Sequence, residues 1–198
     1  SIGALYRKYF EKTGRLPKKL STFYLGNSYK NEEIKIWYEK FQFKNSNTKI
    51  SYIEDIEKKV ANLIFENKIV ARFKGRMEFG ARSLGNRAIL CNPKDISLVR
   101  EINYIIKNRD FWMPFAPSVV NEKKYLVNPK DVNMKFMMIA TKFKKDFENS
   151  FEGVTHPYDF SCRPNVVDEN SNKDYCRLIK YYEELSKDSI ILNTSFNL

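Results

Sequence analysis

The 198-residue chain is 42% hydrophobic and 15% aromatic, a composition that can build a packed core and excludes a globally disordered chain. Its apolar runs are far shorter than the roughly 18 to 20 residues that a membrane-spanning helix needs. The net charge of +11 suits a polyanionic partner such as nucleic acid, an anionic membrane or a phosphate-rich small molecule, although a solvated lysine-rich surface gives the same balance.

The cysteines and the histidine do not form a metal-binding pattern. Cys91, Cys162 and Cys176 lack CxxC spacing, and His156 is the only histidine. We therefore expect reduced, mostly buried thiols and no metal ligands in this chain.

Hydrophobic residues at helical spacing predict helices, and short apolar runs predict strands. Because the two types mix along the chain, we expect an α/β (α+β) fold. The polar segment 45–48 is a candidate domain boundary. In chain order, the sequence predicts helices at 1–12, 28–41 and 53–67, a strand at 68–73, a helix at 97–107, strands at 118–120 and 136–141, a helix at 175–185 and a strand at 189–193.

A loop rich in glycine and arginine, KGRMEFGARSLGNR at residues 74–87, follows the first predicted strand. Lys74, Arg76, Arg82 and Arg87 lie within fourteen residues, and guanidinium groups bind phosphate oxygens in bidentate fashion. Glycines let a backbone approach a ligand closely. The order of residues is neither a Walker A loop nor GxGxxG. The loop therefore predicts a phosphate cradle, or else arginines that pair with surface carboxylates around ordinary turns.

A second cluster, RDFWMPFAPS at residues 109–118, combines Arg109 with aromatic residues and two prolines. Phe111, Trp112 and Phe115 can wall a pocket, stack on a base or pack in the core. Arg109 is the better functional candidate of the cluster.

A third cluster, Asn193-Thr194-Ser195-Phe196-Asn197, directly follows the last predicted strand. Small polar side chains at a strand end can bind a phosphate, a ribose or a carbonyl, although an ordinary polar turn has the same composition. Arg163 can join such an anion site, and the lone His156 is a ligand, a base or a structural residue.

Four motifs carry a resemblance to a known family: GRMEFGARSLGNRAIL, RDFWMPFAPS, VTH…RP…VVD and ILNTSFN. In this order, from about residue 50 to the end, they resemble the C-terminal domain of the O-carbamoyltransferases that modify antibiotics and nodulation factors. The first forty residues resemble the end of that family's N-terminal domain. Ala81, Ser83 and the segment 158–161 depart from the family's usual pattern, which puts specific roles for 158–161 in doubt.

The resemblance implies a YrdC-like fold, a twisted mixed β-sheet flanked by helices and preceded by a short helical segment. It implies that residues 1–45 are the tail of an actin-like domain and a linker, and that residues 46–198 are a carbamoyl phosphate- and ATP-binding domain that lacks its C-terminal end. Lys74-Gly75-Arg76 and Ser195-Phe196-Asn197 match the Lys-x-Arg and Ser-x-Asn signature of YrdC-like synthases.

The implied activity is ATP-dependent O-carbamoyl transfer. Carbamoyl phosphate and ATP, with Mg²⁺, would form carbamoyl-adenylate here, and the missing N-terminal domain would pass the carbamoyl group to a hydroxyl of a sugar or natural product in the cytoplasm. Lys74, Arg76 and Arg87 are the expected catalytic residues. The expected binding residues are Arg82, Asn86, Arg109, Ser118, Arg163, Asn193, Thr194, Ser195 and Asn197.

Two alternatives of other classes stay open. An RNA-binding module would use the net charge of +11 and the aromatic side chains to bind phosphates and stack bases. A catalytically silent domain would only dock the missing N-terminal part. The order of the motifs favours the enzyme, so neither a membrane nor nucleic acid is the expected partner.

Overall fold

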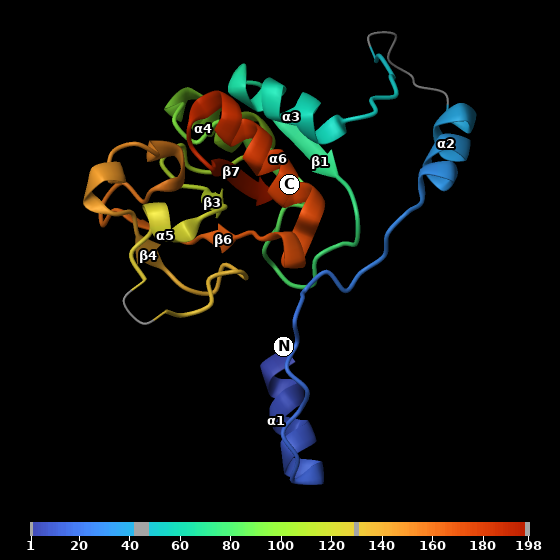
Figure 1. Ribbon diagram of the computed structural model, residues 1–198, viewed down its shortest axis with the longest axis vertical. Helices are drawn as coiled ribbons and strands as arrows, with labels where there is room; N and C mark the ends of the chain where they lie inside the picture. Colours follow the sequence, from blue (N-terminus) through green and yellow to red (C-terminus); the bar gives the residue numbers. More distant parts are fainter. Residues whose placement is uncertain (1, 42–47, 129–130, 197–198) are drawn as a thin grey trace.

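The computed structural model describes residues 2–41, 48–128 and 131–196. The proposed boundary near residue 45 and the predicted binding residue Asn197 lie outside these residues. The described part confirms the α/β class: a mixed five-stranded sheet stands between two sets of helices (Figure 1).

The five strands have the order β1-β2-β7-β3-β6, so the C-terminal strand is central. All neighbours are antiparallel except β3 and β6, which are parallel. A separate two-stranded ribbon pairs β4 with β5. The strands are β1 (Val70–Phe73), β2 (Arg87–Cys91), β3 (Ala116–Val119), β4 (Thr141–Lys142), β5 (Ser161–Cys162), β6 (Asn165–Val166) and β7 (Ile190–Ser195).

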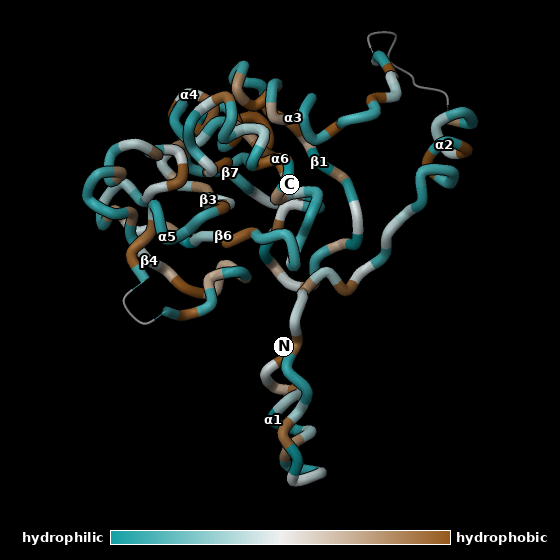
Figure 2. The backbone as a smooth tube through the Cα atoms, in the orientation of Figure 1, coloured by the Kyte–Doolittle hydropathy of each residue, from teal (hydrophilic) through white to brown (hydrophobic). Residues whose placement is uncertain are grey.

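Successive side chains of a strand point to opposite faces of the sheet, so the apolar strands contribute to a core on each face. On β7, Ile190 and Leu192 join the core beneath α4 and η1, whereas Ile191 joins the core beneath α3 and α6. Hydrophobic stretches recur around β7, α3 and α6 (Figure 2).

The helices are α1 (Ile2–Thr13), α2 (Asn31–Lys40), α3 (Ile56–Phe65), α4 (Ile96–Glu101), the π-helical η1 (Ile102–Ile106), α5 (Glu122–Tyr125), the short 3-10 turns η2 (Lys145–Phe147) and η3 (Glu152–Val154), and α6 (Glu169–Ser186).

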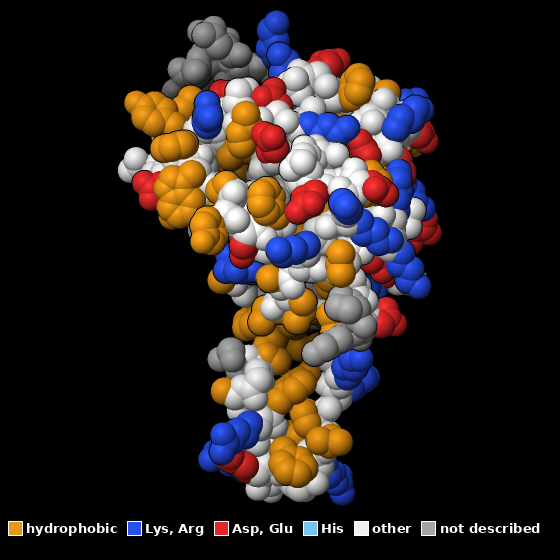
Figure 3. Space-filling view, turned by 90° about the vertical axis from the view of Figure 1, so that its left-hand side faces the viewer, with side chains coloured by type: hydrophobic (Ala, Val, Ile, Leu, Met, Phe, Trp, Pro, Cys, Tyr) orange, Lys and Arg blue, Asp and Glu red, His pale blue; other side chains and the backbone are white. Residues whose placement is uncertain are grey.

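The N-terminal part stands apart from the layered region, and α1 and α2 bury no residue (Figure 1). Hydrophobic side chains gather on the protruding part (Figure 3), where Leu5, Tyr9 and Phe10 are exposed. The connection between the two helices is tied to the domain, because the N–H of Gly26 donates to the carbonyl of Met77 over 2.9 Å.

Most predicted elements are confirmed, but the strand predicted at 136–141 is wrong. Met137 has a positive φ of 54°, which breaks an extended run, and only Thr141 of that segment is in a strand. The helix predicted at 97–107 forms as α4 followed by η1, and the helix predicted at 175–185 begins earlier, at Glu169. Asp168 caps this start by accepting from the N–H of Ser171 over 2.7 Å.

Glu57 of α3 forms a charged network that ties α3 to β1 and α6. It is 1% exposed and accepts hydrogen bonds from Lys74 and, over 2.8 Å, from Arg177, while Arg72 lies 4.0 Å away. Burial by itself raises the pKa of Glu57, but the hydrogen bonds from Lys74 and Arg177 outweigh it, so the pKa lies below its usual value. The buried carboxylate therefore stabilises the fold only while it is charged.

We predict that Gly85→Ala destabilises the fold. Gly85 has φ of 99°, and an added Cβ would lie 2.2 Å from the ring of the fully buried Tyr175. Strain and overpacking together should lower the free energy of unfolding by roughly 2 to 4 kcal/mol, measured by urea denaturation. Gly3→Ala is the matched control, because nothing lies within 4 Å of its added Cβ. Equal midpoints for the two variants would contradict the prediction.

We predict that Glu57→Gln costs on the order of 3 kcal/mol at pH 7, because it removes the charged partner of a buried ion network. Since the folded pKa of Glu57 is lowered, its contribution is present above the unfolded pKa and is lost as pH falls through the folded pKa. The variant should therefore lose less stability than the parent between pH 6 and pH 3. Glu169→Gln, which removes an exposed pair with Lys180, is the control, and a cost equal to that of Glu57→Gln would refute the argument.

Candidate functional site

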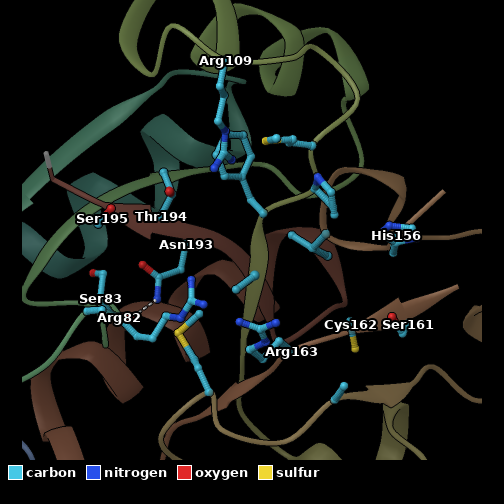
Figure 4. A pocket seen from close by; sticks show the side chains of 18 residues that line it. Arg82, Ser83, Arg109, His156, Ser161, Cys162, Arg163, Asn193, Thr194 and Ser195 are labelled. Carbon is cyan, nitrogen blue, oxygen red and sulfur yellow. Dashed lines mark hydrogen bonds between the residues drawn. The ribbon is translucent and has the colours of Figure 1, made fainter. Parts of the chain in front are cut away.

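A pocket of about 390 Å³ opens where β7 and β3 meet several loops. Loop 81–83, segment 109–116 and segment 154–163 surround the end of β7 (Figure 4). We call it the anion pocket because most of its polar side chains are cations or hydrogen-bond donors. The polar side chains that line it are Arg82, Ser83, Arg109, His156, Ser161, Arg163, Asn193, Thr194 and Ser195.

Three arginines reach the anion pocket from three separate segments (Figure 4). Within the described residues, the side chains of Arg82 and Arg163 make no hydrogen bond or ion pair, and both are exposed. Their five-donor guanidinium groups are thus open to a ligand that accepts hydrogen bonds.

Arg109 is held in place from behind. Its Nε donates to Oδ1 of Asn103 over 2.6 Å, and its guanidinium lies 4.4 Å from the centre of the Phe115 ring. Asn103 is itself fixed, because its amide donates to the carbonyl of Met113 over 3.0 Å. The buried Nη2 of Arg109 has no partner among the described residues, and burial lowers the pKa of the guanidinium. An anion next to Arg109 would satisfy both the nitrogen and the charge.

The end of β7 supplies an acceptor beside these donors. Nδ2 of Asn193 donates to the carbonyl of Ser83 over 2.9 Å, whereas its buried Oδ1 has no partner among the described residues. Ser195 is engaged, because Nζ of Lys107 lies 3.1 Å from its Oγ. Burial, followed by the nearby charge of Arg109, lowers the pKa of Lys107.

His156 lies at the edge of the anion pocket. Its Nδ1 accepts from the N–H of Tyr158 over 3.3 Å and lies 3.2 Å from a carboxylate oxygen of Asp159. These two contacts hold Tyr158 and Asp159 against the imidazole ring and fix its orientation.

The carboxylate of Glu78 organises the loop that presents Arg82. Its Oε1 accepts from the backbone N–H groups of Leu84, Asn86 and Arg87 over 2.9, 2.7 and 3.2 Å. These backbone N–H groups therefore donate to a side chain of the loop itself and are not available to a ligand.

Six of the binding residues expected from the sequence line the anion pocket together: Arg82, Arg109, Arg163, Asn193, Thr194 and Ser195. The other described candidates do not line the anion pocket, and each has protein partners. Lys74 pairs with Glu57 and, over 3.2 Å, with Asp174. Arg76 donates to the carbonyls of Leu25 and Gly26 over 2.9 and 3.1 Å.

Arg87, Asn86 and Ser118 are likewise engaged. Arg87 donates to the carbonyls of Lys74, Gly75, Asn86 and Asn27, so it closes the base of the loop. The amide of Asn86 donates to the carbonyl of Arg76 over 2.8 Å. Ser118 is buried and donates to Asn165 over 3.2 Å.

Sequence reasoning did not place Ser83 or Ser161 in the site, because an isolated serine carries no signal of its own. No group of three or more His, Cys, Asp or Glu side chains in residues 2–41, 48–128 and 131–196 could hold a metal ion. In the same ranges, no helix has both the length and the apolar character to cross a bilayer.

Comparison with known proteins gives the family. The family model described as "Carbamoyltransferase C-terminus" matches residues 61–198. An uncharacterized protein of Methanocaldococcus jannaschii is 36% identical over 91% of this chain and 30% of its own length. The nodulation protein NolNO of Sinorhizobium fredii is 33% identical over 75% of this chain and 22% of its length, and the nodulation protein NolO of Bradyrhizobium diazoefficiens is 29% identical over 87% of this chain and 31% of its length.

The chain spans at most about a third of the length of these relatives. The matched region begins inside α3 and contains the whole sheet and every residue of the anion pocket. The chain belongs to the carbamoyltransferase C-terminal domain family.

Proposed function

We propose that this chain is the part of an ATP-dependent O-carbamoyltransferase that binds carbamoyl phosphate and ATP and forms carbamoyl-adenylate. The observation that carries the proposal is the anion pocket: the chain belongs to a carbamoyltransferase family, and three arginines converge within the matched region. The acceptor hydroxyl would belong to a sugar or natural product, as the resemblance to the carbamoyltransferases that modify antibiotics and nodulation factors implies.

The unpaired groups of the anion pocket complement carbamoyl phosphate. The guanidinium groups of Arg82, Arg109 and Arg163 offer donors to phosphate oxygens. Oδ1 of Asn193 lacks a donor, and the carbamoyl NH₂ supplies one. A phosphate and an amide in one small molecule therefore match both kinds of open group.

The chemistry needs charge stabilisation rather than a nucleophilic side chain. Water would first take the phosphoryl group of carbamoyl phosphate and leave carbamate and inorganic phosphate. A carbamate oxygen would then bond to the α-phosphorus of ATP as the bond to pyrophosphate breaks. The arginines hold the reactants in line and stabilise charge on the phosphoryl oxygens. Mg²⁺ would arrive with ATP and be held by phosphate oxygens and water.

Lys74, Arg76 and Arg87 stay predictions as catalytic residues, as do Asn86 and Ser118 as binding residues and the YrdC-like character of the fold. To reach a phosphate, Lys74 would have to exchange Glu57 for the ligand, and Arg76 would have to release the carbonyls of Leu25 and Gly26. Asn197 lies two residues after the pocket residue Ser195 in sequence and keeps its proposed role.

We further propose that the missing N-terminal domain packs against α1 and α2. The exposed hydrophobic side chains there include Leu5, Tyr9, Phe10 and Trp37, and longer relatives match only over about a third of their length or less. Transfer of the carbamoyl group would need that domain. A cytoplasmic location suits an enzyme that uses ATP and has three free cysteines.

We predict that Arg82→Ala and Arg163→Ala each weaken binding of carbamoyl phosphate by about tenfold to a hundredfold, because each removes a charge-assisted donor worth roughly 1.5 to 3 kcal/mol. Isothermal titration calorimetry measures the affinity. Arg7→Ala is the control, since Arg7 pairs with Glu11 on the remote α1. Arg87 is unsuitable for this test because its guanidinium supports the loop backbone. Unchanged affinity in both pocket variants would refute the assignment of the site.

We predict that the chain releases pyrophosphate from Mg-ATP only when carbamoyl phosphate is present. A coupled pyrophosphate assay, with and without carbamoyl phosphate, measures this dependence. An RNA-binding module would instead bind RNA with a steep salt dependence and would ignore ATP. Absence of both nucleotide binding and pyrophosphate release would reject the enzymatic proposal and favour a docking domain.

A further inference from the structure

Residues 23–27, in the connection between α1 and α2, lie against the loop that joins β1 to β2 (Figure 1). We call this segment the strap. The backbone N–H of Met77 donates to the carbonyl of Asn27 over 3.0 Å, and the N–H of Phe79 donates to the carbonyl of Phe23 over 2.7 Å. Backbone bonds at both of its ends therefore fix the strap along the loop.

Tyr24 ties the strap to the far end of the same loop. Its hydroxyl donates to the carbonyl of Leu84 over 2.7 Å. Burial raises the pKa of Tyr24 to about 12, so the phenol stays protonated and remains a donor at neutral pH. Since Arg82 lies between Phe79 and Leu84, the strap holds the short segment that presents this arginine on both sides.

The strap also supports the wall of the anion pocket. Phe23 and Tyr24 pack against a small hydrophobic cluster of Leu84, Ala116 and Met137. Of these, Ala116 and Met137 line the anion pocket. A displaced strap would return this apolar surface to water, which is unfavourable. One segment therefore braces the loop and the pocket wall together.

Arg82 is the pocket residue most sensitive to this support. Its guanidinium makes no hydrogen bond or ion pair within the described residues, so its place depends on the backbone that carries it. A binding group must be held within roughly 0.5 Å of its productive position to contribute fully. The backbone of the loop, and hence the strap, must therefore supply the precision that the side chain lacks.

We propose that the strap is a positioning segment of the anion pocket: its seating on the loop places Arg82 and so sets the affinity for the bound anion. The inference rests on the proposed function, because it takes carbamoyl phosphate as that anion. The strap runs between α1 and α2, the helices that we propose to contact the N-terminal domain. It is therefore placed to pass the state of that contact to the pocket.

Two variants of the strap test the proposal in the full chain. Gly26→Ala would place a Cβ 2.8 Å from Cβ of Met77 and push the strap away from the loop. Tyr24→Phe removes the donor to Leu84. Each should weaken binding of carbamoyl phosphate about threefold to tenfold, as measured by isothermal titration calorimetry.

Each strap variant has a matched control. Gly3→Ala adds the same methyl group where nothing lies within 4 Å. Tyr182→Phe removes a buried phenol that donates to Oδ1 of Asn92 over 3.1 Å, and Tyr182 does not line the anion pocket. Both controls should bind carbamoyl phosphate as the parent does, even where Tyr182→Phe lowers stability.

Two further readouts separate positioning from general support of the fold. In an Arg82→Ala background, Tyr24→Phe should cause little further loss of affinity, because the strap acts through Arg82. Coupling is reciprocal, so bound carbamoyl phosphate must in turn hold the strap more firmly. The amides of Met77 and Phe79, which donate to the strap, should exchange hydrogen several-fold more slowly with the ligand bound, relative to amides of α3.

The outcomes distinguish this inference from the proposed function. If both strap variants bind as the parent does, or if the loss in Tyr24→Phe adds in full to that of Arg82→Ala, the strap is only a connection and the inference is overturned. A weaker affinity in Arg82→Ala alone would then still support the proposed function. If the parent chain does not bind carbamoyl phosphate, both proposals fall.

Discussion

The contact on which the site depends is the carboxylate of Glu78 within its own loop. By accepting three backbone N–H groups, it closes the segment between β1 and β2 into a fixed shape. That shape places the carbonyl of Ser83 where Asn193 can donate to it, and so joins the loop to the central strand β7. Arg82 belongs to this loop, so its backbone is held in place while its guanidinium group stays open to a ligand.

The sequence predicts the layered core well because its central strands are short runs of apolar residues. Ile190, Ile191 and Leu192 form a short apolar run between polar residues, which is typical of a strand buried on both sides. The wrong strand at 136–141 is equally apolar, and hydropathy alone cannot reveal the positive φ at Met137. The strands β5 and β6 have two residues each, which is too short for any periodic signal.

The site is only partly predictable for a different reason. The residue type shows that an arginine can donate to an oxygen atom, but it does not show whether that oxygen belongs to a ligand or to the protein backbone. Arg82 and Arg163 stay open, whereas Arg76 and Arg87 in the same motif region bind backbone carbonyls. The choice depends on which carbonyls the folded loop leaves unpaired, and that is a tertiary property. Arg109 is an intermediate case, since Asn103 takes one nitrogen and leaves another without a partner.

The cations that give the chain its net charge of +11 have different roles at two places in the structure. Cations such as Lys74 and Arg177 surround the buried Glu57 and stabilise the fold through it. At and beside the anion pocket two cations are partly desolvated instead: burial lowers the pKa of Arg109, and burial together with the charge of Arg109 lowers that of Lys107. Holding these groups charged costs free energy that a bound anion would return. The arginines that are least satisfied within the protein are for that reason the ones best prepared for a ligand.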